Sequence, residues 1–232
     1  MISNVNQRLQ QEINLLLENR EALVVLEAGC GSVSHIKIPN VGKMVGIDIS
    51  EKQLQRNAQL DVKIVGDLQT YPLEKRGYDV IVSWDVLEHL DNPKAALDNF
   101  FEATSKKGIL ILAAPNIVSI KGVVTKLMPH SLQVAFYRYV IGDTRAGIDD
   151  QGPFKAYLRK AMWPEQIKKT ALAKGFSVPY MVKYEGPVPK HLRSRSKIVN
   201  VLFGFIGWFS KIVLGKNNDL TDSDYMIILQ RD

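Results

Sequence analysis

Two acidic residues and two glycines form the part of this chain with the clearest chemistry. An apolar run ends in Glu27, and Gly29 and Gly31 follow it closely. Glycines have no Cβ, so a turn built from them can approach a flat, polar ligand closely. Asp48 ends a second apolar run, where its carboxylate could accept hydrogen bonds from the two hydroxyls of a ribose. These residues predict the nucleoside end of a cofactor site on an open α/β sheet.

The spacing of the glycines bears on which cofactor this is. A dinucleotide fingerprint needs a third glycine at the position of Ser34. Asp48 fits a dinucleotide and any other adenosine cofactor equally well, and a tight turn without a ligand needs only the glycines. A second acidic residue, Asp67, follows the apolar run 62–65 and favours a cofactor site over a ligand-free turn.

Alternating strand-like and helix-like patterns must position these residues. Strands are predicted at 22–27, 44–48, 62–65, 78–83, 109–114, 176–184 and 224–229, and helices at 4–20, 51–59, 93–105 and 163–174. Ser50 is the expected N-cap of the second helix, and Asn92 precedes Pro93, which suits the first position of a helix. The β-α-β alternation predicts an α/β fold with a mostly parallel sheet.

Composition limits the class of protein. With 232 residues, 46% of them hydrophobic, the chain is expected to form a single domain over 1–232, with an N-terminal helix within 1–20. The single cysteine, Cys30, excludes an internal disulfide framework and favours a reducing, cytoplasmic compartment. The first 20 residues lack the uninterrupted apolar stretch of a signal peptide. A net charge of +6 permits attraction to anionic lipid, nucleic acid or acidic substrates.

Two further motifs follow in order along the chain. The run Trp84–Leu90 reads WDVLEHL after the fourth strand, and 114–116 reads APN after the fifth. Together with the glycine loop, Asp48 and Asp67, these motifs in residues 22–116 resemble the class I S-adenosylmethionine-dependent methyltransferases of the small-molecule type, with an EHL signature after strand four. The resemblance implies a Rossmann-like, seven-stranded, mostly parallel sheet with helices on both faces and a helical cap or lid insertion. It also implies S-adenosylmethionine as the cofactor.

The resemblance implies a role for each residue of the cofactor site. The loop would surround the methionine and ribose parts, Asp48 would bind the ribose hydroxyls, and Asp67 would accept a hydrogen bond from the adenine amino group. Ile49 and Leu68 would lie against the adenine ring. The implied cofactor-binding residues are Glu27, Gly29, Cys30, Gly31, Asp48, Ile49, Gly66, Asp67, Leu68, Ser83, Trp84 and Asp85, of which the last three face the sulfonium.

The chemistry of methyl transfer limits the catalytic candidates. Transfer from a sulfonium is an in-line displacement, in which the protein supplies positioning and electrostatics. An oxygen nucleophile can need a base, for which His89 and His130 are the candidates because histidine titrates near neutrality. His89 could instead be a pocket-wall residue and His130 a surface or capping residue, and a carboxylate acceptor would need no base. Asp85, Glu88 and His89 also suit a metal-assisted reaction, but an ordinary helix start explains the acidic residues, and no metal is predicted.

Substrate selection is expected outside the common core. Residues 116–162 form a lid or substrate insertion, in which Tyr137, Arg138 and Tyr139 are the candidate substrate contacts. The alternative is a helix that simply packs on the sheet.

A second insertion, 187–222, precedes the last strand and contains helix-forming sequence. Its apolar run 198–214 is flanked by basic residues. It has three interpretations: a buried helix, a hydrophobic substrate cap, or an interfacial helix through which 190–214 contacts an anionic membrane.

These features predict an S-adenosylmethionine-dependent methyltransferase that acts on a small, apolar or lipid-like metabolite, at oxygen rather than at nitrogen or carbon. Two alternatives remain. One is an RNA methyltransferase, which the lack of a recognisable RNA-binding module disfavours. The other is a catalytically silent S-adenosylmethionine-binding protein. The expected partner is a small-molecule acceptor rather than nucleic acid, in the cytoplasm or at a membrane, and the oligomeric state is left open.

Overall fold

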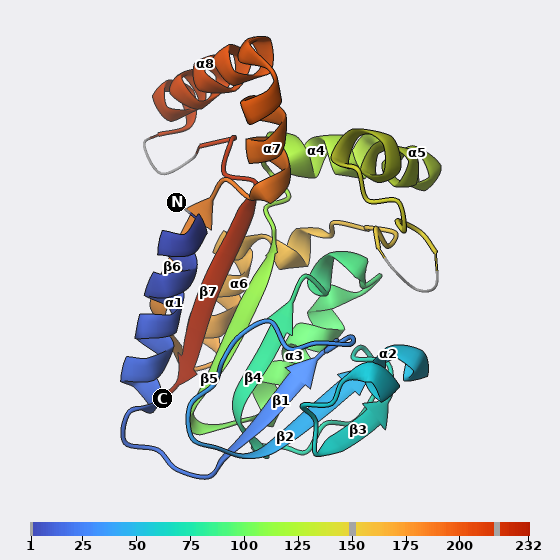
Figure 1. Ribbon diagram of the computed structural model, residues 1–232. Helices are drawn as coiled ribbons and strands as arrows, with labels where there is room; N and C mark the ends of the chain where they lie inside the picture. Colours follow the sequence, from blue (N-terminus) through green and yellow to red (C-terminus); the bar gives the residue numbers. More distant parts are fainter. Residues whose placement is uncertain (1, 149–151, 216–218) are drawn as a thin grey trace.

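A seven-stranded sheet forms the centre of the computed structural model, which describes residues 2–148, 152–215 and 219–232 (Figure 1). The strands lie in the order β3-β2-β1-β4-β5-β7-β6. Neighbouring strands among β1 to β5 are parallel, whereas β7 runs antiparallel to both β5 and β6. The strands are β1 (Leu23–Ala28), β2 (Val41–Asp48), β3 (Val62–Val65), β4 (Tyr78–Trp84), β5 (Thr104–Pro115), β6 (Phe176–Tyr184) and β7 (Asp224–Arg231). The predicted mostly parallel sheet of the Rossmann-like class is confirmed.

Helices cover both faces of this sheet, with α1 on one face and α3 and α6 on the other (Figure 1). The helices are α1 (Ile2–Leu17), α2 (Glu51–Arg56), α3 (Pro93–Ala103), α4 (Ile120–Leu127), α5 (His130–Phe136), α6 (Pro164–Ala173), α7 (Pro187–Arg195) and α8 (Lys197–Leu214), with the short segments η1 (Leu87–His89), η2 (Tyr137–Ile141) and η3 (Lys160–Met162). Both predicted N-caps are confirmed, because the side chain of Ser50 accepts a hydrogen bond from Gln53 N–H and that of Asn92 accepts one from Ala95 N–H.

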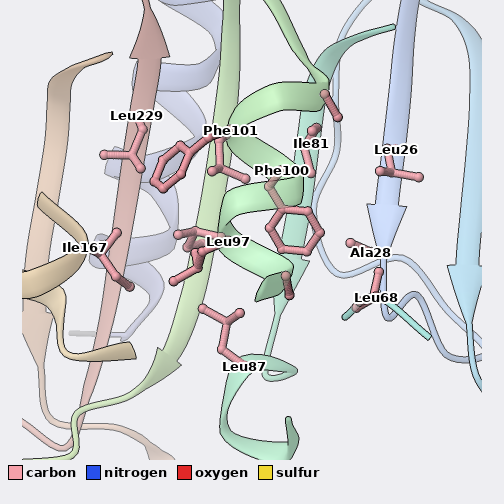
Figure 2. Packing of buried hydrophobic residues seen from close by; sticks show 14 of the residues in the cluster. Leu26, Ala28, Leu68, Ile81, Leu87, Leu97, Phe100, Phe101, Ile167 and Leu229 are labelled. Atoms are coloured by element: carbon pink, nitrogen blue, oxygen red, sulfur yellow. The ribbon is translucent and has the colours of Figure 1, made fainter. Parts of the chain in front are cut away.

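Two clusters of buried apolar side chains hold these layers together. Phe100 and Phe101 of α3 pack on one face of the sheet, with Ile81 of β4 beside them (Figure 2). On the other face, α1 buries Leu9 and Ile13. Each such burial contributes about 1.5–3 kcal/mol to folding. The two clusters fix the strands, and thereby the loops that follow the carboxyl ends of the parallel strands.

The fifth strand begins earlier than predicted, and α3 is correspondingly shorter. β5 starts at Thr104 instead of residue 109, although the polar residues 105–107 favour a loop. Thr104 is fully buried, and its hydroxyl donates to the Phe100 carbonyl at 2.7 Å. Its backbone pairs with Tyr78 of β4. Pairing with a neighbouring strand therefore extends β5 through residues whose own propensity is low.

The N-terminal helix α1 ends at Leu17, before the predicted residue 20. Arg20 leaves the helix and pairs with Asp79 of β4, while its guanidinium also donates to the Lys107 carbonyl at 3.0 Å. This ion pair joins the end of α1 to the amino end of the central strand β4, at the end of the strand opposite the candidate site.

Four helices lie beyond the carboxyl ends of β4 and β5: α4, α5, α7 and α8, here called the cap helices (Figure 1). The first two belong to the segment 116–162, and the other two lie between β6 and β7 in the segment 187–222. Ligands of open α/β sheets bind beside the carboxyl ends of the strands, so the cap helices lie on the side where a site is expected.

Helix α8 turns most of its large apolar side chains toward solvent. Among its described residues, only Gly207 and Ser210 are buried, and Val199, Phe203 and Ile206 are half-buried. An added Cβ on Gly207 would lie 3.2 Å from Asp219, and Ser210 Oγ accepts from Leu220 N–H at 3.3 Å. The interpretation of 198–214 as a buried helix is therefore wrong, because most of its large apolar side chains are exposed. The outer face of α8 comprises Ile198, Val201, Leu202, Phe205, Trp208, Phe209, Ile212 and Val213, all exposed. In the part of the chain that the structure describes, no helix is long and apolar enough to cross a membrane.

Candidate active site

The glycine loop joins the ends of β1 and β2. Gly29 and Gly31 have φ values of +72° and +53°, a region that glycine adopts without strain. Gly29 N–H donates to the Ile47 carbonyl at 2.8 Å, and Gly31 N–H donates to Asp48 Oδ2 at 2.9 Å. Asp48 Oδ1 accepts from Ser50 N–H at 2.8 Å. Asp48 therefore orders both the loop and the start of α2, and each of its oxygens keeps a second lone pair for a ligand.

The loop leaves no space for a side chain at Gly29, whereas an added Cβ on Gly31 would meet only the movable end of the Gln53 side chain. A Cβ on Gly29 would lie 2.4 Å from Cγ2 of Val86, and one on Gly31 would lie 2.9 Å from Oε1 of Gln53. Side chains there would fill the surface between β1, β2 and β4. This cradle fits the close backbone approach that the resemblance implies for a nucleoside cofactor.

We expect Gly29→Ala to lower the free energy of unfolding by about 2–5 kcal/mol, the sum of left-handed strain and overpacking against Val86. Gly175→Ala is the matched control, because Gly175 has a similar φ of +78° but nothing within 4 Å of an added Cβ. That variant should lose only about 1–2 kcal/mol. Urea unfolding measures both, and equal losses would show that Val86 yields without cost.

The ends of β2 and β3 present surfaces suited to an adenosine. Ile49, directly after Asp48, is 76% exposed and offers an apolar surface for a planar ring. Gly66 N–H donates to the Asp48 carbonyl at 3.0 Å, which places the end of β3 beside the end of β2. Leu68 is buried in the core below them.

Asp67 lies at the same strand ends but already has a protein partner. Its Oδ1 accepts from the main-chain N–H of Gln69 at 2.9 Å and from the Gln69 side-chain amide at 3.0 Å. The Gln69 Oε1 in turn accepts from Asn92 N–H at 2.7 Å. A ligand amino group at Asp67 would therefore share the carboxylate with Gln69 or displace its amide.

A pocket opens beside the glycine loop, at the ends of β1 and β4. It is lined by Glu27, Ala28, Gly29, Cys30, Val33, His35, Val82 and Trp84. Burial raises the pKa of Glu27, although the hydrogen bond that its carboxylate accepts from Ser34 Oγ at 2.5 Å opposes this. The rings of His35 and Trp84 stack with their centroids 6.0 Å apart. No sequence pattern points to His35, which joins the pocket only because its loop folds back over β4.

The thiol of Cys30 packs with Leu54 and Leu60 in a small apolar cluster. Burial, followed by the charges of Asp48 and Glu27, raises the pKa of Cys30 to about 12. The thiol is therefore protonated at neutral pH and is no nucleophile. Any part that Cys30 takes in cofactor binding falls to its main chain.

A cluster of ionisable side chains lies at the carboxyl ends of β4 and β5. Asp85 follows Trp84 with a φ of +52°, and Glu88 lies on η1. Lys121 of α4 places Nζ 2.7 Å from Oδ1 of Asp224 on β7. Loss of hydration around the carboxylate, followed by the charge of Asp224, raises the pKa of Asp85 to about 6, and Lys121 opposes the rise. The residue as a whole is exposed, so a ligand can reach it even though protein atoms crowd its carboxylate.

Glu88 is the most deeply buried member of this cluster. It is 4% exposed, and burial, followed by the charge of Asp85, raises its pKa well above the usual carboxyl range. Among the described residues, Oε2 of Glu88 has no hydrogen-bond partner, and neither has Oγ of the buried Ser83. An unpaired buried polar atom costs about 1–3 kcal/mol. Such atoms are positions at which a bound ligand can supply the missing hydrogen bond.

His89 is held in one orientation beside Glu88. Its Nδ1 lies 3.0 Å from the Lys155 carbonyl, which can only accept, so Nδ1 carries the proton and Nε2 has the free lone pair. Nε2 lies 3.9 Å from Glu88 Oε1. Burial lowers the pKa of His89, so the ring is neutral at pH 7. His130, at the start of α5, is exposed and approaches His89 closely enough to contribute to this lowering.

The three candidate substrate residues occupy different surroundings. Tyr137 is half-buried and lies close enough to Lys121 for that cation to counteract the rise that burial causes in its pKa. Arg138 Nε donates to the Ala146 carbonyl at 2.8 Å and thereby holds the insertion together. Tyr139 is 84% exposed. The structure brings only Tyr137 to the ionisable cluster, to which Lys121 and Asp224 also belong without any sequence signal that points to them.

Metal ligation needs several donors at one point. In residues 2–148, 152–215 and 219–232, no three His, Cys, Asp or Glu side chains gather closely enough to hold a metal ion.

Glu88 should make the protein less stable as pH rises. Its pKa is raised in the folded state, so above the usual value of 4.5 the folded chain holds a proton that the unfolded chain has lost. The free energy of unfolding should therefore fall from about pH 5 upward. The glutamine of Glu88→Gln cannot titrate, so this variant should show a smaller loss of stability with rising pH. Glu18→Gln is the control, because Glu18 is exposed and lies far from this cluster, directly after α1, and it should leave the pH dependence unchanged. Urea unfolding at several pH values measures the slopes, and identical slopes for wild type and Glu88→Gln would contradict the interpretation.

Comparison with known proteins agrees with this geometry. The family described as "Methyltransferase domain" matches residues 1–141. An uncharacterized protein from Methanocaldococcus jannaschii is 30% identical over 109 residues, which cover 46% of this chain and 48% of that protein. The mitochondrial ubiquinone biosynthesis O-methyltransferase of Saccharomyces cerevisiae is 26% identical over 125 residues, which cover 49% of this chain and 40% of that enzyme. The chain thus spans about half the length, or less, of these curated relatives.

A solved structure shares the fold over almost the whole chain. The S-adenosylmethionine-dependent methyltransferase from Mesorhizobium loti superimposes with a TM-score of 0.55 at 12% identity, covering 95% of this chain and 96% of that one. The family match spans more than half of the chain and contains the glycine loop, Asp48, Asp67 and η1. The chain therefore belongs to the methyltransferase-domain family, that of the class I S-adenosylmethionine-dependent methyltransferases.

Proposed function

We propose that this chain binds S-adenosylmethionine at the ends of β1, β2 and β3 and transfers its methyl group to an oxygen atom of a small, apolar or lipid-like acceptor. Asp48 has lone pairs left for ribose hydroxyls, and Ile49 offers an exposed apolar surface for adenine. The pocket beside Glu27 would receive the methionine part. When bound, the cofactor supplies an activated methyl group on a positively charged sulfur.

The observation that carries the choice of oxygen is the pair formed by Glu88 and His89. A hydroxyl loses its proton when it is methylated, and a neutral imidazole with a free Nε2 can take that proton. The Oε2 of Glu88 has no partner among the described residues and could orient the same hydroxyl. The name of the yeast relative, an O-methyltransferase, supports the same acceptor atom.

In the proposed reaction, His89 Nε2 removes the proton of the acceptor hydroxyl. The acceptor oxygen forms a bond to the methyl carbon while the carbon–sulfur bond breaks, and that electron pair remains on sulfur. His89 then releases the proton to water. Positioned proton transfer of this kind contributes typically about 10²–10⁴-fold to a rate.

The segment 116–162 is proposed to cover the acceptor. It contributes Lys121 and Tyr137 to the surroundings of Asp85 and Glu88, as their mutual electrostatic effects show. Because Arg138 is engaged with the Ala146 carbonyl, we assign it to the structure of this lid and not to the acceptor.

Calorimetric titration with S-adenosylmethionine and with its demethylated product tests the first half of the proposal, and absence of binding would end it. Incubation with methyl-labelled cofactor and separate lipid, water-soluble and RNA fractions tests the second half. Label in a lipid or other apolar hydroxyl compound is expected. Label in RNA alone would support the RNA methyltransferase alternative, and binding without transfer to any fraction would support the catalytically silent protein.

A further inference from the structure

The cap helices carry an uneven distribution of charge. The segments 117–142 and 186–218 contain nine of the 30 Lys and Arg residues of the chain and none of its 24 Asp and Glu residues. The remainder therefore has 21 basic residues against 24 acidic ones. All of the net positive charge of the chain resides in these two segments, whose described residues lie at one end of the sheet.

The same end of the molecule exposes apolar side chains. The outer face of α8 includes Phe205, Trp208 and Phe209, which are 58%, 60% and 52% exposed. On α4, Leu127 is 77% exposed, and Val124 beside it is 47% exposed. Scattered apolar residues are ordinary on a protein surface, but a continuous helix face of this kind marks a site of interaction.

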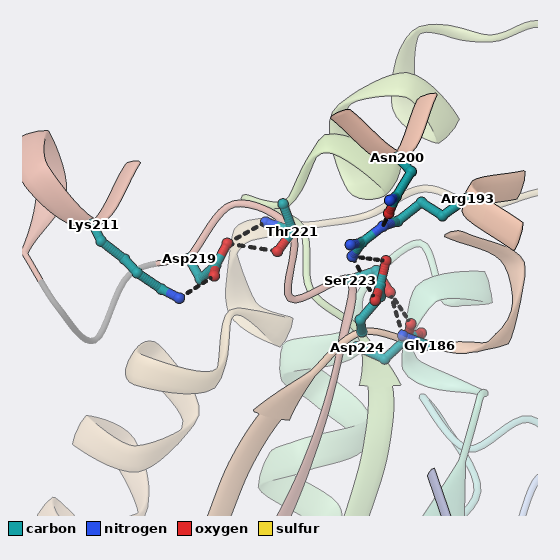
Figure 3. A network of polar contacts seen from close by, with 9 residues as sticks. Gly186, Arg193, Asn200, Lys211, Asp219, Thr221, Ser223 and Asp224 are labelled. Atoms are coloured by element: carbon teal, nitrogen blue, oxygen red, sulfur yellow. Dashed lines mark hydrogen bonds and ion pairs between the residues drawn. The ribbon is translucent and has the colours of Figure 1, made fainter. Parts of the chain in front are cut away.

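Two basic side chains of the α7–α8 hairpin pair with acidic residues that lie just outside it (Figure 3). Arg193 of α7 places Nη1 2.9 Å from Oε1 of Glu185, and its Nε donates to Oδ1 of Asn200 on α8 at 2.9 Å. Lys211 lies 2.8 Å from Asp219. The outer face of α8 is therefore apolar, with the exposed side chains of Arg195 and Lys197 next to the start of the helix.

We propose that the outer face of α8, together with the exposed side of α4, lies on an anionic lipid bilayer. An amphipathic helix with aromatic residues on its apolar side and basic residues around it binds in the headgroup region. Arg195 and Lys197 at the start of α8 and Lys126 of α4 are exposed and would meet the lipid phosphates. In the part of the chain that the structure describes, no helix is long and apolar enough to cross a bilayer, so we place α8 along the bilayer surface.

The charge distribution favours lipid over a second copy of the chain. A symmetric dimer through this face would bring two segments without acidic residues against each other, so that cations meet cations. The negative potential of an anionic leaflet complements the same face.

Docking on a bilayer would also affect the proposed reaction, although the docking proposal does not depend on that reaction. The cap helices and the cluster around Glu88 lie at the same end of the sheet, so a docked molecule would present the cluster's side toward the bilayer (Figure 1). If the proposed function holds, an apolar acceptor would reach the cluster directly from lipid.

Flotation of the full chain with vesicles, without cofactor, tests the proposal. We expect it to float with vesicles of phosphatidylcholine and phosphatidylserine at least ~10-fold more than with phosphatidylcholine alone, and high salt should release it. The double variant Phe205→Glu/Trp208→Glu should lose this binding. Leu172→Glu is the matched control, because Leu172 on α6 is 54% exposed but lies outside the cap. Circular dichroism and calorimetry should show unchanged folding and unchanged cofactor affinity in both variants.

A second measurement reports the docked surface directly. Trp208 is one of three tryptophans, and its fluorescence should shift to the blue on anionic vesicles, a shift that Trp208→Phe removes. No flotation with either kind of vesicle, or equal loss in Leu172→Glu, would overturn the proposal. A third result would also overturn it: the chain binds no vesicles but self-associates in sedimentation, and Phe205→Glu/Trp208→Glu abolishes this self-association. The occupant of the face would then be a second copy of the chain.

Discussion

Asp48→Ala is expected to weaken binding of S-adenosylmethionine by at least ~100-fold in calorimetric titration. Hydrogen bonds to a charged group are worth about 1.5–3 kcal/mol each, and the proposed site uses both carboxylate oxygens for ribose hydroxyls. Losing about 3 kcal/mol corresponds to roughly 150-fold in the dissociation constant. The variant also releases Gly31 N–H and Ser50 N–H, which Asp48 holds at 2.9 and 2.8 Å. Loop order and ligand contacts are therefore lost together.

Asp61→Ala is the matched control for this prediction. Asp61 Oδ2 also accepts a backbone hydrogen bond, from Met44 N–H at 2.7 Å, but toward the amino end of β2. Removing it should cost stability in urea unfolding and leave cofactor affinity within a factor of about two. Equal affinity losses in both variants would show that the effect comes from strand order and not from ribose contact. Unchanged affinity in Asp48→Ala would place the ribose elsewhere.

His89→Ala is expected to reduce kcat by about 10²–10⁴-fold, with the cofactor dissociation constant unchanged, once labelled transfer has identified an acceptor. The physical reason is the orientation of the ring, in which Nδ1 donates to the Lys155 carbonyl and Nε2 is left to take a proton. His89→Gln separates this role from a structural one. Its amide can still donate to Lys155 but cannot act as a base, so turnover should fall as in His89→Ala.

The pH dependence of kcat/KM and a variant of His130 test further whether His89 is the base. A base with a pKa below 6.5 should make kcat/KM rise with pH below neutrality and stay level above it, and this rise should disappear in His89→Gln. His130→Ala should retain kcat within a few-fold, because His130 is exposed. Full turnover in His89→Gln would reduce His89 to a pocket-wall residue. Loss of turnover in His130→Ala alone would transfer the role of base to His130.

We expect the buried polar groups of this site to lower the free energy of unfolding while they serve turnover. Glu88 and Ser83 each keep a buried oxygen without a partner among the described residues. Natural sequences tolerate such destabilising groups where activity requires them. Glu88→Gln should then raise the free energy of unfolding and lower kcat.

Local patterns were sufficient for much of the fold. β3 and β6 have the bounds that their apolar runs predict, because short runs limited by turn residues leave little choice of strand. Ser50 and Asn92 cap α2 and α3 as expected, since capping depends on a side chain and an N–H three residues away. The start of β5 at Thr104 could not be predicted in this way, because it depends on pairing with Tyr78 in a distant strand.

The sequence by itself determined where the residues of the proposed cofactor site lie in the fold. Glu27, the two glycines, Asp48 and Asp67 each stand directly at or after the end of a strand, and the parallel sheet brings such ends together.

Only the tertiary structure decided the acid–base cluster and the surface of the cap. Lys121 and Asp224 are far apart in the chain and meet because β7 inserts beside β5. His89 obtains its orientation from Lys155 in a different segment. For α8, the sequence favours a core or cap helix over an interfacial helix. The structure excludes the buried helix, because among its described residues only Gly207 and Ser210 are buried and the aromatic side is exposed.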